Sequence, residues 1–242
     1  MLFDFPDRIK DSDRCHMRCV CDRCDSDCCN DGCMSFFTLE LLLQHSNIPS
    51  SRQTRLTVDY DGCSDKAKTY IRNIILDPQK FVFGGYSIYL HGKTGVGKST
   101  LATKILLNYL FSMCDCSIPE SNCRGMFVPV SDIVQYCRSN KDAVDFDENM
   151  DILKKCDLLV LDNIFDFDYT SYVQEILSSI IRYRVSNSLS IIYTSNLSPK
   201  ELNNKLPLFS SLVCENGIPI EFKGDDHRLN AEDFDKAFGG DV

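Results

Sequence analysis

The chain has 242 residues, of which 43% are hydrophobic and 25% are charged, and this length suffices for one α/β domain with a full core and a small appendage, but not for two large domains. With 26 basic and 35 acidic residues the formal net charge is -9, so the surface as a whole repels a phosphate backbone, and any contact with nucleic acid must be local or made through a partner. No uncharged apolar run approaches the length of about 18 residues that a membrane span needs, which excludes a membrane-spanning protein.

The start of the chain carries no targeting signal that we can identify. Residues 1–7 are acidic and lack the apolar stretch of a secretory signal, so the sequence predicts a cytoplasmic location. In that compartment thiols stay reduced, and the 14 cysteines are not expected to form a disulfide framework.

Residues 1–36 form a polar segment that is crowded with cysteine and too poor in apolar side chains to build a core. Cys21 and Cys24 have the spacing of a zinc knuckle, and we expect Cys29 and Cys33 to complete one tetrahedral Zn²⁺ site. Further candidate ligands in the same pool are Cys15, His16, Cys19 and Cys28. A two-zinc cluster, an iron–sulfur cluster and unligated cysteines remain alternatives. We interpret the later cysteines as small core or surface residues: Cys114, Cys116, Cys123, Cys137, Cys156 and Cys214.

Two helices are predicted ahead of the core. The first covers residues 36–44 and stops before the sequence Ser-Asn-Ile-Pro at 46–49, because the residue before a proline leaves helical conformations. A linker through Asp61 and Gly62 leads to the second helix at 66–76, whose apolar residues fall on one side.

From residue 86 onward apolar strands alternate with helices, which predicts a parallel sheet with crossover helices. The expected strands are residues 87–91, 125–130, 157–162, 189–194 and 218–223. The expected helices lie near residues 98–113, 130–139 and 170–185. We interpret the acidic stretch 142–151 as a solvated loop and residues 230–242 as a polar tail.

A glycine-rich loop, Gly-Lys-Thr-Gly-Val-Gly-Lys-Ser at 92–99, follows the first expected strand and precedes a helix, as a phosphate-binding P-loop requires. Its glycines allow backbone N–H groups to converge on phosphate oxygens at the helix N-terminus. Lys98 is predicted to reach the β- and γ-phosphates of ATP, and the Ser99 hydroxyl to bind Mg²⁺. The residues predicted to bind ATP here are Gly92, Lys93, Thr94, Gly95, Val96, Gly97, Lys98, Ser99 and Thr100.

A second motif is the apolar strand 158–162, which ends in Asp162 and is typical of a Walker B motif, whose carboxylate holds Mg²⁺ through water. Asn163 follows, where many such ATPases carry a glutamate that polarises the attacking water. An amide orients water but accepts no proton at neutral pH, so we expect slow hydrolysis. A substitute base at Asp166 or Asp168 is an alternative.

The strand 189–194 leads into Ser195 and Asn196, at the sheet edge where ligands of α/β proteins bind. Asn196 is predicted to sense the γ-phosphate or to position water, although Asn196 to Glu201 also has the pattern of a helix start. The candidate catalytic residues are therefore Lys98, Asp162, Asn163 and Asn196.

The ordered set 92–99, 158–163 and 194–196 resembles the AAA+ ATPases, and more narrowly the helicase loaders of the DnaC/DnaI type with the related transposition helper ATPases. Local matches at 46–49, 195–198 and 220–228 select this family, and the resemblance covers residues 36–228. It implies an AAA+ core with a reduced or missing lid, and an N-terminal module, often zinc-bearing, that grips the helicase. It also implies that Arg228 lies near the phosphates.

The resemblance divides the chain into a zinc module at 1–36, a helical linker and helicase-docking segment at 37–80, an ATPase core at 81–228 and a tail at 229–242. It implies a replicative DNA helicase and single-stranded DNA as partners, with assembly into a homo-oligomer when ATP is bound.

Two departures from the family pattern favour ATP binding over hydrolysis. One is Asn163, and the other is Ser211, at the position where the family usually carries an arginine finger. The alternatives are a non-hydrolysing adaptor or inhibitor of a replication protein and a transposition helper, while a nucleotide kinase fits less well.

Overall fold

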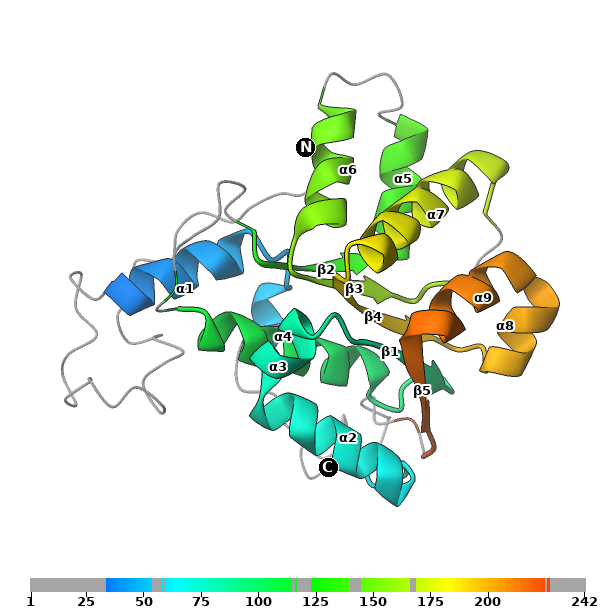
Figure 1. The fold of residues 1–242 in the computed structure, drawn as a ribbon, viewed down its shortest axis with the longest axis horizontal. Helices are drawn as coiled ribbons and strands as arrows, with labels where there is room; N and C mark the ends of the chain where they lie inside the picture. Colours follow the sequence, from blue (N-terminus) through cyan, green and yellow to red (C-terminus); the bar gives the residue numbers. More distant parts are fainter. Residues whose placement is uncertain are drawn as a thin grey trace, which may run out of the picture.

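A five-stranded parallel sheet organises the chain (Figure 1), in the computed structural model that describes residues 34–53, 58, 60–114, 116, 123–139, 145–165, 169–224 and 226. The strands are β1 Ser87–Gly92, β2 Gly125–Pro129, β3 Leu158–Asp162, β4 Ser190–Ser195 and β5 Gly217–Phe222. Their order across the sheet is β2-β3-β4-β1-β5, and every neighbouring pair is parallel. Because β4 lies between β1 and β3, the carboxyl ends of these three strands meet at one edge.

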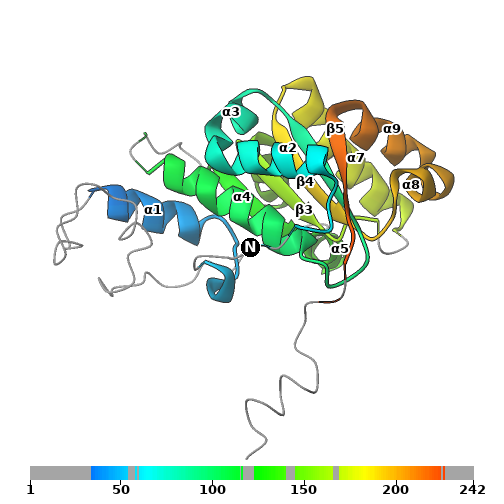
Figure 2. The same ribbon diagram turned by 90° about the horizontal axis from the view of Figure 1, so that it is seen from below.

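Helices cover both faces of the sheet and make a three-layer α/β/α fold (Figures 1 and 2). One face carries α1 Met34–Gln44, α2 Asp65–Leu76, α3 Pro78–Phe83 and α4 Lys98–Ser112, with the short 3₁₀ turn η2 Ser50–Arg52 after α1. The other carries α5 Val130–Ser139, α6 Phe146–Lys155, α7 Ser171–Ser186, α8 Pro199–Lys205 and α9 Pro207–Asn216.

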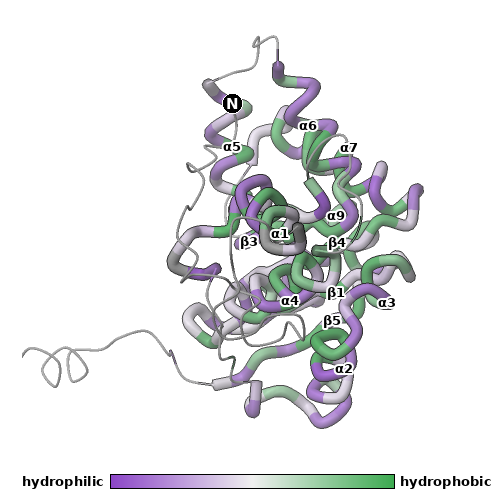
Figure 3. The backbone as a smooth tube through the Cα atoms, turned by 90° about the vertical axis from the view of Figure 1, so that its left-hand side faces the viewer, coloured by the Kyte–Doolittle hydropathy of each residue, from purple (hydrophilic) through white to green (hydrophobic). Residues whose placement is uncertain are grey.

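The strands divide the hydrophobic core in two because successive side chains point to opposite faces. On β1, Ile88 and Leu90 join the cluster under α1 to α4, whereas Tyr89 joins the cluster under α5 to α9. In Figure 3 the covering helices α5, α6 and α7 alternate between hydrophilic and hydrophobic stretches, as helices with one buried face do. The described residues include no helix that is both long enough and apolar enough to cross a membrane.

The outer edge of β2 is closed by the turn that follows α1. The Phe127 N–H donates to the Ser46 carbonyl oxygen at 2.8 Å, and the Asn47 side-chain amide donates to the Phe127 carbonyl oxygen at 2.9 Å. Asn47 has a φ of 53°, a left-handed conformation that asparagine tolerates better than most residues. The Ser-Asn-Ile-Pro sequence therefore acts as the hydrogen-bonding partner of an otherwise open strand edge.

The prediction of a loop at 142–151 is wrong for the described part of that stretch, which forms α6 from Phe146 onward. Asp147 and Glu148 lie in the first turn and Lys154 and Lys155 in the last, an arrangement that complements the helix dipole. Helices α3 and α9 were also outside the predicted set, and each begins with a proline in its first turn.

Arg184 on α7 donates hydrogen bonds to the end of α6 and to the starts of β3 and β4. Its side chain is fully buried, and its Nη1 donates to the Cys156 carbonyl oxygen at 2.7 Å while its Nη2 donates to the Ser190 carbonyl oxygen at 2.7 Å. Nη1 also donates to the Leu153 carbonyl oxygen, near the end of α6, at 2.9 Å. One guanidinium thus satisfies carbonyl groups at the end of α6 and at the starts of β3 and β4.

Candidate nucleotide site

The loop 92–99 has the backbone geometry of an anion-binding nest. Gly92, Gly95 and Gly97 have φ angles of 143°, 83° and 96°, which residues with a side chain rarely adopt. Gly97 is the N-cap of the 15-residue helix α4, and no side chain caps the helix there. The first N–H groups of α4 are therefore directed at the loop, where a phosphate is the favoured partner.

Lys98 lies at the centre of this loop, and its side chain is nearly buried, with 5% of the residue exposed. Its Nζ donates to the carbonyl oxygens of Gly92 at 2.8 Å and Lys93 at 2.6 Å. It also donates to Asn196 Oδ1 at 3.1 Å, and the Thr94 hydroxyl reaches the same oxygen at 3.4 Å. The structure thus brings Asn196, at the end of β4, into direct contact with the P-loop lysine.

Asp162 is held by a hydroxyl from the neighbouring strand. The buried Thr194 side chain donates to Asp162 Oδ1 at 2.7 Å and accepts from the Asn163 N–H at 2.9 Å. This pair of bonds orients the carboxylate at the carboxyl edge of the sheet, beside the strand that carries Asn196. Thr194 belongs to the 194–196 match, but its bond to Asp162 was not predicted, because that bond depends on β4 lying next to β3.

Asn163 has a structural reason to be an asparagine. Its φ is 56° and its side chain is exposed, so the residue sits in a left-handed conformation that glutamate adopts only with strain. This backbone conformation suits asparagine at position 163 better than glutamate. Asp166 and Asp168, the alternative bases, lie outside the described residues.

A carboxylate from the end of the chain approaches the P-loop. A side chain at Gly95 would collide with the carboxylate of Asp226, so Asp226 lies directly against the glycine. The motif match at 220–228 thus reaches the loop at Asp226, while Arg228 lies outside the described residues. The match placed this segment near the phosphates through Arg228, but it did not predict that the carboxylate of Asp226 would lie against the loop.

A cavity of about 330 Å³ adjoins the loop and is lined by His91, Lys93, Asn196, Glu201, Glu221 and Lys223, among others. Burial lowers the pKa of His91, an effect that the nearby Glu221 opposes and Lys98 reinforces. The imidazole also stacks on Tyr89, with ring centroids 5.7 Å apart. His91 is therefore a neutral packing residue at the end of β1, which sequence reasoning did not single out.

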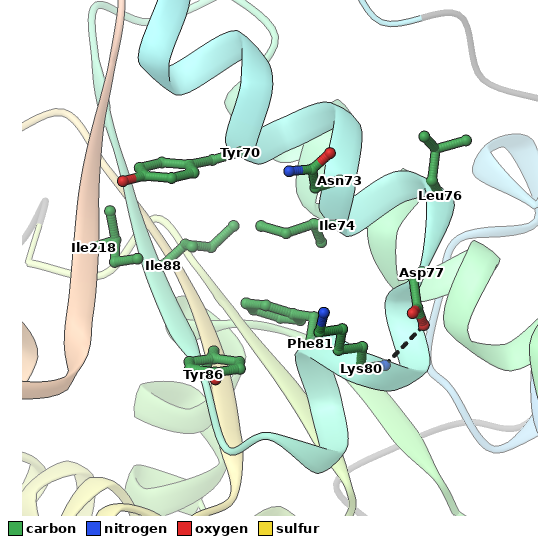
Figure 4. Close-up of a pocket in the computed structure, with 10 residues that line it drawn as sticks. All are labelled: Tyr70, Asn73, Ile74, Leu76, Asp77, Lys80, Phe81, Tyr86, Ile88 and Ile218. Carbon is green, nitrogen blue, oxygen red and sulfur yellow. Dashed lines mark hydrogen bonds between the residues drawn. The ribbon is translucent and has the colours of Figure 1, made fainter.

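A second, more apolar groove lies away from this chemistry (Figure 4). It has a volume of about 650 Å³ and opens between α2, α3 and the edge formed by β1 and β5. Tyr70, Ile74, Phe81 and Ile218 point into it, and none of the predicted ATP-binding residues lines it. We take the P-loop as the candidate nucleotide site, because a lysine, a carboxylate and helix N–H groups converge there among the described residues.

The metal predictions concern two separate parts of the chain, the Mg²⁺ ligands of the P-loop region and the zinc ligands near the N-terminus. Ser99 lies in the first turn of α4, and Asp162 lies at the end of β3, so both are on the edge where Mg²⁺ would accompany the phosphates. No group of three or more His, Cys, Asp or Glu side chains within the described ranges is arranged to hold a metal. The zinc candidates Cys21, Cys24, Cys29 and Cys33 lie outside those ranges, and zinc analysis of the intact protein is the test of that prediction.

Comparison with known proteins supports the resemblance seen in the motifs. The chain is 27% identical over 121 residues to the replicative helicase loader DnaI of Bacillus subtilis (strain 168), a match that spans 50% of this chain and 36% of that protein. No family model matches the sequence.

Solved structures show the same fold. The crystal structure of the DnaC helicase loader has a TM-score of 0.56 and 22% identity, covering 69% of this chain and 94% of that one. The crystal structure of DnaI has a TM-score of 0.56 and 21% identity, covering 74% and 96%. The replication initiator DnaA bound to AMPPCP and single-stranded DNA has a TM-score of 0.54 and 18% identity, covering 70% and 49%. The sequence similarity and the shared fold confirm the predicted α/β core and the resemblance to DnaC/DnaI-type AAA+ loaders.

Proposed function

We propose that this chain is an ATP-binding helicase loader of the DnaC/DnaI type, which delivers a replicative helicase to single-stranded DNA and uses ATP binding with weak hydrolysis as its switch. The observation that carries the proposal is the convergence of Lys98, Asn196 and Asp162 at one edge of a sheet with the DnaC/DnaI fold. The similarity to DnaI supplies the replication context, and DNA and helicase as partners are part of the proposal.

The residues of the site fit Mg²⁺-ATP. When bound, its phosphates would supply the negative charge that the loop and Lys98 are arranged to bind. Lys98 would exchange the Gly92 and Lys93 carbonyl oxygens for phosphate oxygens, while the N–H groups at the start of α4 bind the same anion. Asp162, oriented by Thr194, and Ser99 would hold Mg²⁺.

Asn196 connects the nucleotide to the rest of the domain. It contacts Lys98 and lies two residues before Ser198, the N-cap of α8. A change in the contact between Asn196 and Lys98 would therefore shift the start of α8. Helix α9 packs against α8 and would respond to that shift. We infer that this connection allows ATP binding to order a surface for assembly with another copy of the chain.

Hydrolysis is expected to be weak for two local reasons. Asn163 cannot take a proton from water, and its backbone conformation disfavours glutamate. Ser211 is exposed on α9, so this chain offers a hydroxyl where an arginine finger would stabilise a neighbour's transition state.

Co-purification with a replicative helicase from the same source, with and without ATP, tests the loader. We expect ATP-dependent binding and helicase transfer to single-stranded DNA, and we expect Lys98→Ala to abolish the ATP dependence. Lys155→Ala, an exposed lysine on α6 outside both the P-loop and the proposed docking segment, is the matched control and should leave both unchanged. Absence of helicase binding in every nucleotide state would contradict the proposal.

A non-hydrolysing adaptor is the second candidate, and Asn163 and Ser211 are the residues that favour it. Steady-state turnover measured beside equilibrium ATP binding separates the two. Turnover that rises with helicase and single-stranded DNA supports the loader, whereas tight binding with no turnover in any condition supports the adaptor. Full partner binding by Lys98→Ala would also support the adaptor.

A further inference from the structure

The buried arginine of α7 needs an opposite charge. Arg184 is 0% exposed, and within the described residues no carboxylate forms an ion pair with it. Its hydrogen-bonded oxygens are all backbone carbonyls, which carry no net charge: those of Leu153, Lys154, Cys156, Asp157 and Ser190. Burying an uncompensated charge is costly, so a counter-charge is expected nearby.

The neighbour that can supply this charge is the thiol of Cys156. Its Sγ lies 3.4 Å from Arg184 Nη1, and the residue is buried, with 3% exposed. A hydrogen bond from Cys123 lowers the pKa of Cys156; burial opposes this shift and the Arg184 charge adds to it. A thiolate formed at Cys156 would therefore have the guanidinium as its partner at this 3.4 Å distance.

Cys123 lies next to Cys156 by strand register. Gly125 on β2 pairs with Leu158 on β3, and the Leu158 N–H donates to the Arg124 carbonyl oxygen at 3.1 Å. One step back, Arg124 Nη1 and Asp157 Oδ2 are in contact at 2.8 Å, so Cys123 and Cys156 form the next pair along, on the opposite face. Neighbouring strands are about 4.7–4.9 Å apart, which lies within the range that a disulfide bridges.

We propose that Cys156 and Cys123 form a redox-active dithiol, in which the Arg184-paired thiolate of Cys156 reacts with a peroxide and Cys123 closes a disulfide. The thiolate sulfur attacks one oxygen of hydrogen peroxide, an S–O bond forms as the O–O bond breaks, and the departing hydroxide takes up a proton to become water. The Cys123 sulfur then attacks the sulfenic sulfur, forming the S–S bond and releasing the second water. Two thiols lose two electrons, and the peroxide is reduced to two waters.

The disulfide is expected to be reversible. Oxidation removes the negative charge of Cys156 and leaves Arg184 buried without it, so the folded protein favours the reduced form. The pair lies at the amino ends of β2 and β3, the sheet edge opposite Lys98 and Asp162. Its chemistry is therefore independent of nucleotide binding and of the proposed function.

Peptide mapping of the full-length protein tests the proposal. After hydrogen peroxide treatment, remaining thiols are alkylated and the protein is digested with trypsin, which releases residues 105–124 and 156–182 as separate peptides. We expect a disulfide-linked pair of these peptides, loss of alkylation at Cys123 and Cys156, and disappearance of the linked pair when glutathione is added before alkylation.

Matched variants identify the cysteines involved. Peptide 105–124 also contains Cys114 and Cys116, so Cys123→Ser should abolish the link and Cys114→Ser should retain it. Cys137, which is buried on α5, should stay alkylatable. Oxidation of the exposed Cys116 or Cys214 with Cys123 and Cys156 still alkylatable would overturn the proposal, as would a link that survives in Cys123→Ser or resists glutathione.

Discussion

At the scale of single residues, the hydroxyl of Thr194 and the carboxylate of Asp226 determine how the nucleotide site is arranged. Thr194 holds Asp162 and the Asn163 N–H together, and Asp226 brings a negative charge against Gly95. Both residues lie in segments that match the family, 194–196 and 220–228, but the sequence predicted neither contact: Thr194 bonds to Asp162, and Asp226 lies against Gly95.

Replacing Thr194 with valine should weaken both the fold and the Mg²⁺-dependent binding of ATP. The change keeps the shape but leaves the buried Asp162 oxygen and the Asn163 N–H without this partner, which costs about 1–3 kcal/mol of unfolding free energy. Chemical denaturation and ATP titrations with and without Mg²⁺ measure the two effects. Thr194→Ser keeps the hydroxyl and should resemble the original protein; equal losses in both variants would contradict the role of the hydroxyl.

Replacing Asp226 with asparagine should raise the affinity for ATP. The carboxylate repels the phosphate charge that the loop binds, and a repulsion of about 1 kcal/mol at the surface corresponds to a several-fold change in the dissociation constant. Isothermal titration of ATP measures the change. Glu175→Gln on α7 removes an equal charge without contact to the loop and should have little effect, so an affinity gain of the same size there would indicate a general charge effect.

The sequence predicts part of this site and not the rest. Gly92, Lys98 and Asp162 are recognisable because their roles follow from local spacing, and the structure places them together with Asn196. The roles of Thr194 and Asp226 depend on which strands are neighbours and where the chain turns after β5, and one unaligned sequence contains no direct record of either. The cysteine pair was overlooked for the same reason, since 33 positions of chain separate Cys123 from Cys156.

At the scale of elements, the start of α8 controls the orientation of Asn196. Ser198 accepts from the Glu201 N–H at 3.3 Å, and Glu201 accepts from the Ser198 N–H at 2.8 Å, which makes a capping box. The Ser198 hydroxyl, which donates to Glu201 Oε2 at 2.6 Å, and the Ser198 N–H both lower the pKa of Glu201, so the carboxylate stays ionised and the box persists well below neutral pH.

Removing this cap should affect ATP binding as well as stability. Ser198→Ala is expected to cost about 1 kcal/mol of unfolding free energy and to weaken ATP binding, because the turn that holds Asn196 against Lys98 loses its anchor. Thr170→Ala removes the N-cap of α7, away from the loop, and should cost similar stability with ATP affinity unchanged. Denaturation and ATP titration of both variants make the comparison; a matching loss of affinity in Thr170→Ala would assign the effect to stability alone.

The sequence predicted helices and strands correctly where the apolar periodicity was strong. It missed helices whose composition resembles a loop or whose periodicity is weak. The five strands and the helices α4, α5 and α7 follow from apolar periodicity, and their observed ends differ from the expected ones by one residue at most. Helix α6 was not predicted, because its acidic first turn has the composition of a loop. The buried Met150 and Leu153 nevertheless lie at helical spacing. Helices α3 and α9 are short or weakly patterned, and tertiary packing decides whether such segments are helical.

At the scale of the whole molecule, Arg184 joins the second helical layer to the sheet. Arg184→Met should destabilise the protein by about 3–5 kcal/mol, since it leaves several buried carbonyl oxygens and the Cys156 sulfur without their partner. Arg182→Met, an exposed neighbour on the same helix, should change the unfolding free energy very little. Urea unfolding followed by circular dichroism measures both, and a small loss in Arg184→Met would mean that the carbonyl groups find other donors.

The closure of β2 by Ser46 and Asn47 bears on where this protein can be cut. A shortened chain that starts after residue 53 would display the backbone of Phe127 as an open strand edge and would lose Leu39, Leu42 and Ile48 from the core beneath α4. The smallest fragment expected to fold alone therefore begins no later than Met34, ahead of the residues that the phosphate motifs mark out. Limited proteolysis should therefore leave α1 attached to the sheet, and we expect this helix to remain with the domain when the chain is shortened.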